Sequence, residues 1–263
     1  RQAFALEQWI GRYGRGVSEW FDSLSGFDAC NSLANFAFNH PEASFPETRT
    51  AGDMLLEVRQ LGHPLLFGEV VRNDLRLAKG HFMVITGANM AGKSTFLRAV
   101  SLSLVMANTG LPVFAESMSY TPIPLITSMR TADSLSRHES YFFAELKRLK
   151  KIVEHLQSGP YFVVLDEILK GTNSMDKAKG SREFLERLLQ MPATGLIATH
   201  DLSLCEVAEG QPRVGNYFFD VEIRDGELFF DYRLKPGVCS NMNASFLLRK
   251  LGVVDEGLGG DSG

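Results

Sequence analysis

Apolar residues recur with a helical period over the first forty positions of the chain. Between residues 1 and 24 glycines interrupt this period, so the pattern predicts one helix with a weak middle or two short helices. We expect Gly26 to break the pattern and a second amphipathic helix to follow until Pro41 stops it. The aromatic residues of this helical lead carry no chemical pattern and are expected to serve packing.

Short extended segments replace the helical pattern after a linker at 42–52. We expect strands at 54–61 and at 62–71, because both runs are short, apolar and bounded by turn residues. A turn is expected at 73–80, and it leads into an apolar strand that ends at Thr86. This part of the chain therefore predicts a small β-rich layer.

Helical and extended segments alternate from Thr86 onward. The pattern predicts a helix ending at about Asn108, a strand within 122–131, a helix at 141–156, a strand at 161–167, a helix at 181–190 and a strand at 196–198. Such alternation is typical of an α/β fold with a mainly parallel core sheet. A hairpin is expected around the turn at Asp225 and Gly226.

Three parts of the chain follow from these patterns. We predict a helical segment at 1–41, an α/β domain at 42–253 and a tail at 254–263. The tail is poor in apolar residues and is expected to be disordered. Because Arg1 stands where an initiator methionine is expected, we interpret the chain as an excised fragment.

Composition narrows the function classes further. The chain has 263 residues, 44% hydrophobic and 22% charged, with a net charge of −4, which fits a globular protein without the basic face of a nucleic-acid binder. The basic cluster at 147–151 is more simply a solvated helix face than a DNA contact. Three distant cysteines give neither a disulfide framework nor a metal knuckle and favour the cytoplasm. No apolar run approaches the ~18 residues of a membrane helix, so we expect no membrane contact in this chain.

A glycine-containing loop between the predicted strand and helix carries the clearest chemical pattern. The nine residues of this segment follow the G-x-x-x-x-G-K-S/T spacing: Gly87, Ala88, Asn89, Met90, Ala91, Gly92, Lys93, Ser94 and Thr95. Backbone N–H groups of such a loop and the positive end of the helix dipole can surround a triphosphate. Lys93 is predicted to reach the β- and γ-phosphates, and the Ser94 hydroxyl is predicted to bind Mg2+.

Three further candidates stand where buried strands end. Asp166 and Glu167 follow the apolar run 162–165, and the carboxyl ends of parallel strands are where ligands bind. Asp166 suits Mg2+, and Glu167 suits a general base that orients the attacking water. His200 ends the next strand and can hydrogen-bond a γ-phosphate or that water. His63 has no second metal-binding residue nearby and is interpreted as structural.

These motifs resemble the ATPase domain of the MutS family of DNA mismatch repair proteins. GANMAGKST at 87–95 is similar to the family's GPNMGGKST, LDEILKGTNSMD at 165–176 to MDEIGRGTSTYDG, and ATHDLSL at 198–204 to ATHYFEL. The segments LGHPLL, NDLRL and YRLKPGVCSNMNAS also stand where the family has comparable runs. The likeness covers nearly the whole chain, including the end of the helical core that precedes the ATPase domain.

The resemblance implies a P-loop NTPase fold of the ABC-type ATPases that binds ATP and Mg2+. It implies that Asn89 touches the terminal phosphate, that Glu167 activates water and that His200 senses the γ-phosphate. Where the family has an aromatic residue beside the adenine, this chain has Val70 or Val71, which implies an aliphatic platform.

A homodimer through the ATPase domain is implied as well. In the family a serine of a G-R-S-T-F-like run reaches the nucleotide of the partner, and here Ser140 keeps that serine while His138 and Glu139 replace the glycine and arginine. ATP closing this dimer in a DNA repair protein is the function that the resemblance implies. DNA contact is expected through parts of the parent outside this chain.

Two alternative functions belong to other classes than a MutS-like DNA repair ATPase. An ABC transporter ATPase would carry an LSGGQ run, which the span 111–160 lacks. A nucleotide-gated interaction module of a MutS-related protein that does not act on mismatches would carry the same motor, so this alternative stays open. GTP as the fuel is disfavoured, because the chain has no Asn-Lys-x-Asp run.

Overall fold

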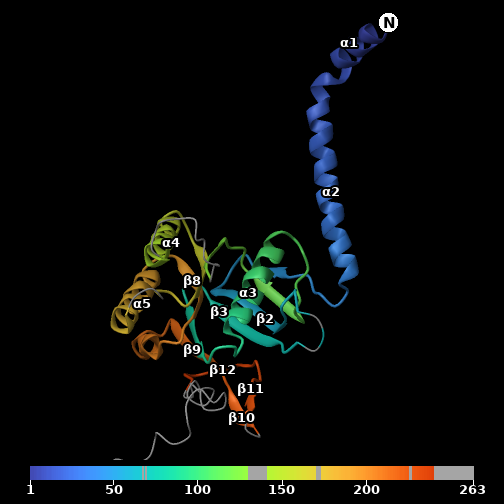
Figure 1. Cartoon of the computed structure of the whole chain (residues 1–263). Coiled ribbons are helices and arrows are strands. Elements are labelled where there is room, and N and C mark those ends of the chain that lie inside the picture. Colours follow the sequence, from blue (N-terminus) through green and yellow to red (C-terminus); the bar gives the residue numbers. More distant parts are fainter. Residues whose placement is uncertain (67, 69, 130–140, 170–172, 225–226, 240–263) are drawn as a thin grey trace, which may run out of the picture. The chain divides into compact units, whose positions relative to one another are not determined.

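The computed structural model describes the whole chain except residues 67, 69, 130–140, 170–172, 225–226 and 240–263 (Figure 1). The chain divides into two compact units, Arg1–Ala43 and Ser44–Gly263, and each is described by itself. Within the described residues, no helix combines the length and apolarity that crossing a membrane requires. The predicted tail at 254–263 lies outside the described residues.

Two helices joined by a short turn make up the first unit: α1 (Gln2–Tyr13), the 3-10 turn η1 (Gly14–Gly16) and α2 (Val17–Asn39). Neither helix buries a side chain, and the rings of Trp9, Tyr13 and Trp20 contact one another beside the turn. The predicted break at Gly26 is wrong, because α2 continues through it. A single glycine costs a helix only about 1 kcal/mol, which a long helix tolerates.

A six-stranded sheet forms the centre of the second unit. Its order is β12 (Leu234–Pro236), β9 (Val214–Phe219), β4 (Phe82–Gly87), β8 (Ala193–Ala198), β7 (Tyr161–Asp166) and β6 (Leu125–Ser128). All neighbouring pairs are parallel except β12 with β9. The predicted α/β class with a mainly parallel sheet is therefore confirmed. As a consequence, β4, β7 and β8 all end at one edge of this sheet.

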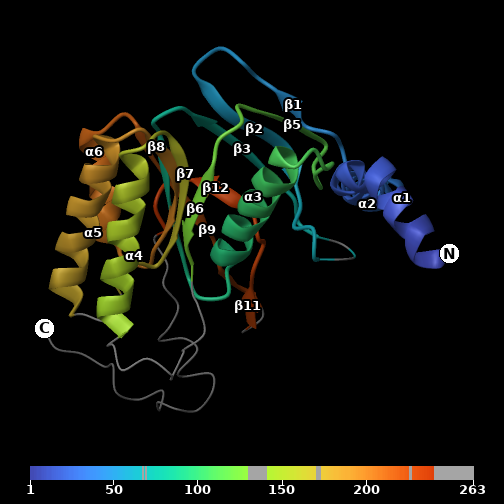
Figure 2. The same ribbon diagram turned by 90° about the horizontal axis from the view of Figure 1, so that it is seen from above.

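Helices cover both faces of the six-stranded sheet (Figure 2). The helix α3 (Lys93–Asn108) packs on one face, and α4 (Tyr141–Leu156) and α5 (Ser174–Leu189) pack on the other. Successive side chains of a strand point to opposite faces, so Ile85 joins the core under α3 while Val84 joins the core under α4 and α5. This explains why β4 is apolar from Phe82 to Ile85. The short helices η2 (Leu202–Glu206) and α6 (Val207–Gly210) follow β8.

A four-stranded sheet supplies the β-rich layer that the sequence predicts. Its order is β1 (Glu47–Thr48), β5 (Ser117–Tyr120), β2 (Met54–Leu61) and β3 (Asn73–Ala78). The predicted strand at 62–71 is wrong, because the described residues of this range form no strand. The predicted turn at 73–80 is also wrong, because Asn73–Ala78 form the strand β3. Leu75 and Leu77 are buried and alternate with exposed residues, which is the period of a half-buried strand. Both leucines pack into the core beneath α3.

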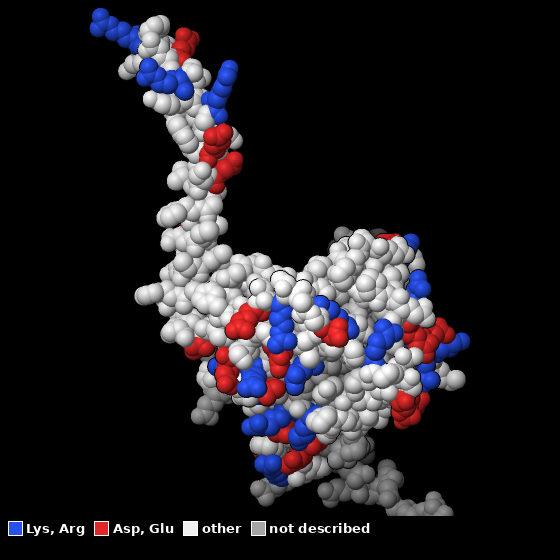
Figure 3. All heavy atoms as spheres, turned by 180° about the vertical axis from the view of Figure 1, so that it is seen from behind, with Lys and Arg blue, Asp and Glu red and all other residues white. Residues whose placement is uncertain are grey.

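The predicted hairpin consists of β10 (Glu222–Arg224) and β11 (Glu227–Phe229), which pair antiparallel on either side of the turn residues outside the described part. Figure 3 shows acidic and basic side chains interspersed over one face of the Ser44–Gly263 unit. On that face no single sign of charge gathers over the described residues, in agreement with the composition.

Gly195 provides a test of how closely the central strands approach. It pairs with Val163 across β8 and β7, and a Cβ atom at this position would lie 1.9 Å from the Val163 carbonyl oxygen. We expect Gly195→Ala to lower the free energy of unfolding by about 2 kcal/mol or more, because the strands must move apart. Urea unfolding followed by circular dichroism measures this loss. Gly159→Ala, where nothing lies within 4 Å, is the control that should leave the midpoint unchanged.

Candidate functional site

The glycine-containing loop between β4 and α3 has a backbone that few sequences permit. Gly87 has φ +140°, and a Cβ there would lie 2.5 Å from the Phe219 carbonyl oxygen. Gly92 has φ +106° and Met90 has φ +66°, so the loop turns through left-handed conformations twice. Ala91 is buried and has no positive φ, so an alanine fits there without strain. The loop therefore keeps its backbone close to β9 and exposes Met90.

The α3 helix begins directly behind this loop. Its N-cap is Gly92, which has no side chain to satisfy the N–H groups of the first turn. These N–H groups and the helix dipole give the loop a positive local potential. Ser94 and Thr95 in the first turn line the cleft in front of the helix.

Lys93 is the charged residue at the centre of the site. Its side chain is buried, and its ammonium nitrogen donates to the carbonyl oxygens of Gly87 at 2.7 Å and Ala88 at 2.8 Å. The same nitrogen lies 3.4 Å from Nε2 of His200. A buried ammonium needs such acceptors, and phosphate oxygens would be stronger ones.

Asp166 ends β7 in a dry environment. It is 5% exposed, and neither of its carboxylate oxygens has a hydrogen-bond partner among the described residues. Leaving a carboxylate buried and unpaired costs several kcal/mol, of the order quoted for ions in protein interiors (about 3–5). A divalent cation would remove that cost, and Mg2+ commonly takes only one or two carboxylates, with phosphate oxygens and hydroxyls completing its shell. Within the described residues no cluster of three or more His, Cys, Asp or Glu side chains that could hold a metal ion is found.

Glu167 and His200 face each other across the ends of β7 and β8. The Glu167 N–H donates to the Ala198 carbonyl at 2.8 Å, and its side chain, 12% exposed, places Oε1 2.8 Å from His200 Nε2. One ring nitrogen cannot accept from Lys93 and donate to Glu167 at the same time. The shorter contact favours a proton on Nε2 that is donated to the carboxylate. Glu167 is thereby held by two bonds to β8 and its continuation.

Backbone strain is concentrated in the segment that carries Glu167. Both Glu167 (φ +53°) and Leu169 (φ +60°) are left-handed without being glycine, a conformation that costs about 1 kcal/mol or more per residue. The Leu169 N–H donates at 2.7 Å to the carboxylate of Glu145, a buried residue of α4. Together with the bond to Ala198, this contact fixes the strained segment at both ends.

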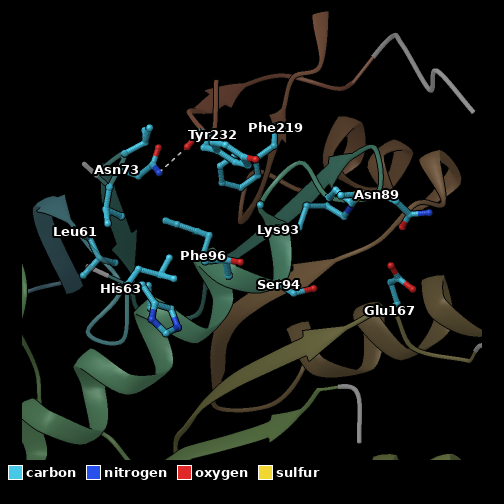
Figure 4. Close-up of a pocket in the computed structure, with 17 residues that line it drawn as sticks. Leu61, His63, Asn73, Asn89, Lys93, Ser94, Phe96, Glu167, Phe219 and Tyr232 are labelled. Carbon is cyan, nitrogen blue, oxygen red and sulfur yellow. Dashed lines mark hydrogen bonds between the residues drawn. The ribbon is translucent and has the colours of Figure 1, made fainter. Parts of the chain in front are cut away.

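A cleft of about 580 Å³ opens over the loop, in the size range of small-molecule sites (Figure 4). One end holds the polar groups of Asn89, Lys93, Ser94 and Glu167. The other end is largely apolar; it is lined by Leu61, Leu66, Val70, Val71, Phe96, Ala99, Phe219 and Tyr232. A ligand with an anionic end and a flat apolar end matches this division.

The structure brings most of the predicted residues to this cleft. Eight of them line it: Val70, Asn89, Met90, Gly92, Lys93, Ser94, Thr95 and Glu167. His200 reaches the site through its contacts with Lys93 and Glu167, whereas Asp166 and Ala91 are buried and are not among the residues that line the cleft. Ser140 lies outside the described residues. The roles of all these residues stay predictions.

Sequence reasoning missed the aromatic wall of the cleft. Tyr232 and Phe219 line the same cleft as the aliphatic residues that the sequence indicates. A Cβ on Gly92 would lie 3.1 Å from the Tyr232 ring, so the ring reaches the loop itself. No spacing in the sequence marks Tyr232, because it belongs to a segment far along the chain.

His63 also lies in the cleft wall, and its surroundings fit the structural interpretation. Its Nδ1 accepts the Leu65 N–H at 3.1 Å. Burial, and then the nearby charge of Arg98, lower the pKa of His63 below its usual value. The imidazole is therefore neutral near pH 7 and carries its proton on Nε2.

Comparisons with known proteins identify relatives of this chain. The family model described as MutS domain V matches residues 83–249. The chain is 34% identical over 245 residues to the DNA mismatch repair protein MutS of Myxococcus xanthus, covering 90% of this chain and 27% of that protein. It is 30% identical over 262 residues to MutS of Methanosarcina barkeri (95% and 28%), and 32% identical over 200 residues to human MutS protein homolog 4 (72% and 21%). The chain thus spans roughly a quarter of the length of the curated relatives it matches.

The bond between Glu145 and Leu169 can be tested through stability. Glu145→Leu leaves the buried Leu169 N–H without its acceptor, which costs about 1–3 kcal/mol of the free energy of unfolding. Glu145→Gln keeps an acceptor oxygen at the same place and should lose clearly less. Urea unfolding of the two variants measures the difference, and equal losses would contradict a role for this bond.

Proposed function

Because the chain belongs to the MutS family, we propose that it binds ATP with Mg2+ in the cleft over the β4–α3 loop and hydrolyses it. The observation that carries this proposal is the line of contacts from Lys93 through His200 to Glu167 at one edge of the sheet. A cation for phosphates, a carboxylate for water and a histidine between them are the groups that phosphoryl transfer to water needs. The loop would act as a P-loop of an ABC-type ATPase.

The residues present fit a magnesium ion. Asp166 offers two buried oxygens without a partner among the described residues, and Ser94 offers a hydroxyl in the first turn of α3. Bound Mg2+ supplies positive charge that offsets the charge of the β- and γ-phosphates. The described side chains supply few other ligands, so phosphate and water oxygens would complete its coordination.

Hydrolysis follows from the same positions. Lys93 exchanges its bonds to the loop carbonyls for phosphate oxygens, while the N–H groups of the loop and of α3 bind the remaining oxygens. A water molecule attacks the γ-phosphorus with its oxygen while Glu167 accepts one of its protons. The bond between the γ-phosphorus and the oxygen that bridges it to the β-phosphate then breaks, and ADP is released. His200 holds the Glu167 carboxylate and is near enough to Lys93 to meet the γ-phosphate.

The apolar end of the cleft would take the adenine. Val70 offers the aliphatic surface that the sequence indicates, and Tyr232 adds an aromatic ring on the same cleft. Stacking on an aromatic ring contributes about 1–3 kcal/mol per base in nucleic-acid complexes. The presence of an aliphatic and an aromatic surface in one cleft supports binding of a flat base there.

The dimer and DNA parts of the function reach beyond the described residues. We infer that ATP closes two copies of this domain head to tail, with Ser140 of each facing the nucleotide of the other, and that hydrolysis reopens them. In the parent this cycle would drive a DNA repair protein, as the names of its relatives suggest. DNA contact would come from the parts of the parent that this chain does not contain.

Replacing the proposed base should separate binding from turnover. We expect Glu167→Gln to bind ATP with unchanged affinity and to lose about 100-fold or more in kcat, because the amide cannot accept the proton. Phosphate release and isothermal titration measure the two quantities. Glu186→Gln, an exposed change on α5, is the matched control. Turnover that survives in Glu167→Gln would show that the base is another group.

The contact in trans can be tested with mixed dimers. We expect Ser140→Ala to reduce hydrolysis at saturating ATP, since the serine acts on the partner's nucleotide. A dimer that carries one intact Ser140 should keep about half of the activity, one of its two sites being complete. Ser117→Ala, an exposed strand position, should change nothing. Full activity of the doubly substituted dimer would exclude this role.

A further inference from the structure

Asn73 connects two distant parts of the second unit through one side-chain amide. Its Nδ2 donates to the Tyr232 carbonyl at 3.0 Å (Figure 4), and its Oδ1 accepts the Leu234 N–H at 2.7 Å. Asn73 begins β3 of the four-stranded sheet, and Leu234 begins β12 at the edge of the six-stranded sheet. The amide therefore pairs with this backbone as a neighbouring strand would, with one donor and one acceptor.

The backbone between these two bonds is strained. Tyr232 has φ +52°, a left-handed conformation that is unusual for a bulky residue and has to be held by its surroundings. Neighbouring bonds assist: Lys235 lies 2.7 Å from Asp231 and 3.2 Å from Asp220. Burial alone would raise the pKa of Asp231, but its bonds from Lys235 and the Arg233 N–H lower it below its usual value. Several hydrogen bonds and ion pairs thus hold the turn around Tyr232, and Asn73 is the residue that links this turn to β3.

The position of the Tyr232 ring is what this turn determines. The ring stacks on Phe230 with centroids 5.9 Å apart and planes at 23°, approaches Gly92 of the loop, and lines the apolar end of the cleft. It is 44% exposed, so part of it remains open to a ligand. Rotation of the Tyr232 backbone toward an ordinary φ would move this ring away from its present place. The polar groups around Lys93 belong to β4, the loop, α3 and the ends of β7 and β8, and not to that turn.

We propose that Asn73 is a positioning residue for the nucleobase: its two bonds hold the Tyr232 ring where the base of the bound nucleotide stacks. This inference rests on the proposed ATP site. The asparagine amide satisfies both partners, whereas aspartate would keep the acceptor for Leu234 but lose the donor to Tyr232, and leucine would lose both. Asn73 acts on binding through the ring and has no part in the transfer of the phosphoryl group.

Two ligands distinguish the positioning of the Tyr232 ring from a purely structural link between the two sheets. Isothermal titration measures the Kd of the chain for ATP and for inorganic tripolyphosphate, both with Mg2+. Tripolyphosphate carries the charge of ATP without the base, so it reports on the loop alone. We expect Asn73→Asp and Asn73→Leu to weaken ATP about tenfold, the scale of one lost base–aromatic stack, and to leave tripolyphosphate within about twofold of the original chain.

Two further variants complete the test. Asn108→Leu deletes another bond from an asparagine amide to a backbone carbonyl, that of Ile123, away from the cleft, and should leave both ligands unchanged. Tyr232→Ala should weaken ATP by itself, and adding Asn73→Leu to it should cause little further loss, because the ring that Asn73 positions is gone. Asn73→Asp, which is nearly isosteric, serves if Asn73→Leu does not fold.

Each outcome decides one way. The positioning role is supported if the Asn73 substitutions weaken the binding of ATP but not of tripolyphosphate, and if Asn73→Leu causes little further loss of ATP affinity once Tyr232→Ala is present. Equal weakening of ATP and tripolyphosphate, unchanged ATP binding, or independent losses from the two residues would overturn it while leaving the proposed ATP site intact. An original chain that binds neither ligand would instead remove the proposed function, and this inference with it.

Discussion

The contact between Glu167 and His200 is the interaction around which the site is organised. It exists because β7 and β8 are parallel neighbours that end together, and because both strands are buried along their length. The polar residues that follow these apolar runs are therefore forced to the same edge of the sheet. β4 runs parallel to β8 and ends at the same edge, which brings Lys93 to His200. The chemistry of the site is thus a consequence of strand order.

The cleft needs the second sheet as well. The β4–α3 loop, α3 and the end of β7 provide its polar end. Its apolar end combines residues of α3 and β9 with residues of β2, of the segment that follows β2 and of the turn before β12. Asn73 joins these contributions through two hydrogen bonds. A nucleotide bound across the cleft would therefore touch parts of the chain that share no secondary-structure element. In the proposed site this arrangement would let one domain bind the phosphates with loop backbone and the base with side chains.

Sequence patterns predicted the parts of this structure that depend on local chemistry. The apolar runs before Gly87, Asp166 and His200 are strands, since each is too short for a helix and is bounded by turn residues. The patterns did not predict β3, because Leu75 and Leu77 are a short alternation between charged residues. They could not place the Tyr232 wall either, because its tie to Asn73 joins residues 159 positions apart. Long-range contacts of this kind leave no period in the sequence.

Asp166 shows why the site is more consistent with a ligand than with a purely structural role. A carboxylate that served the fold would be paired, as Glu145 is with the Leu169 N–H, because an unpaired buried charge costs several kcal/mol out of the roughly 5–15 that stabilise a whole domain. Both Asp166 oxygens lack a partner among the described residues. Strain at Glu167, directly after it, adds to this cost. The fold therefore tolerates two destabilising residues, Asp166 and Glu167, at the end of one strand. In a hydrolysis site Asp166 would bind the cation and Glu167 would bind the attacking water.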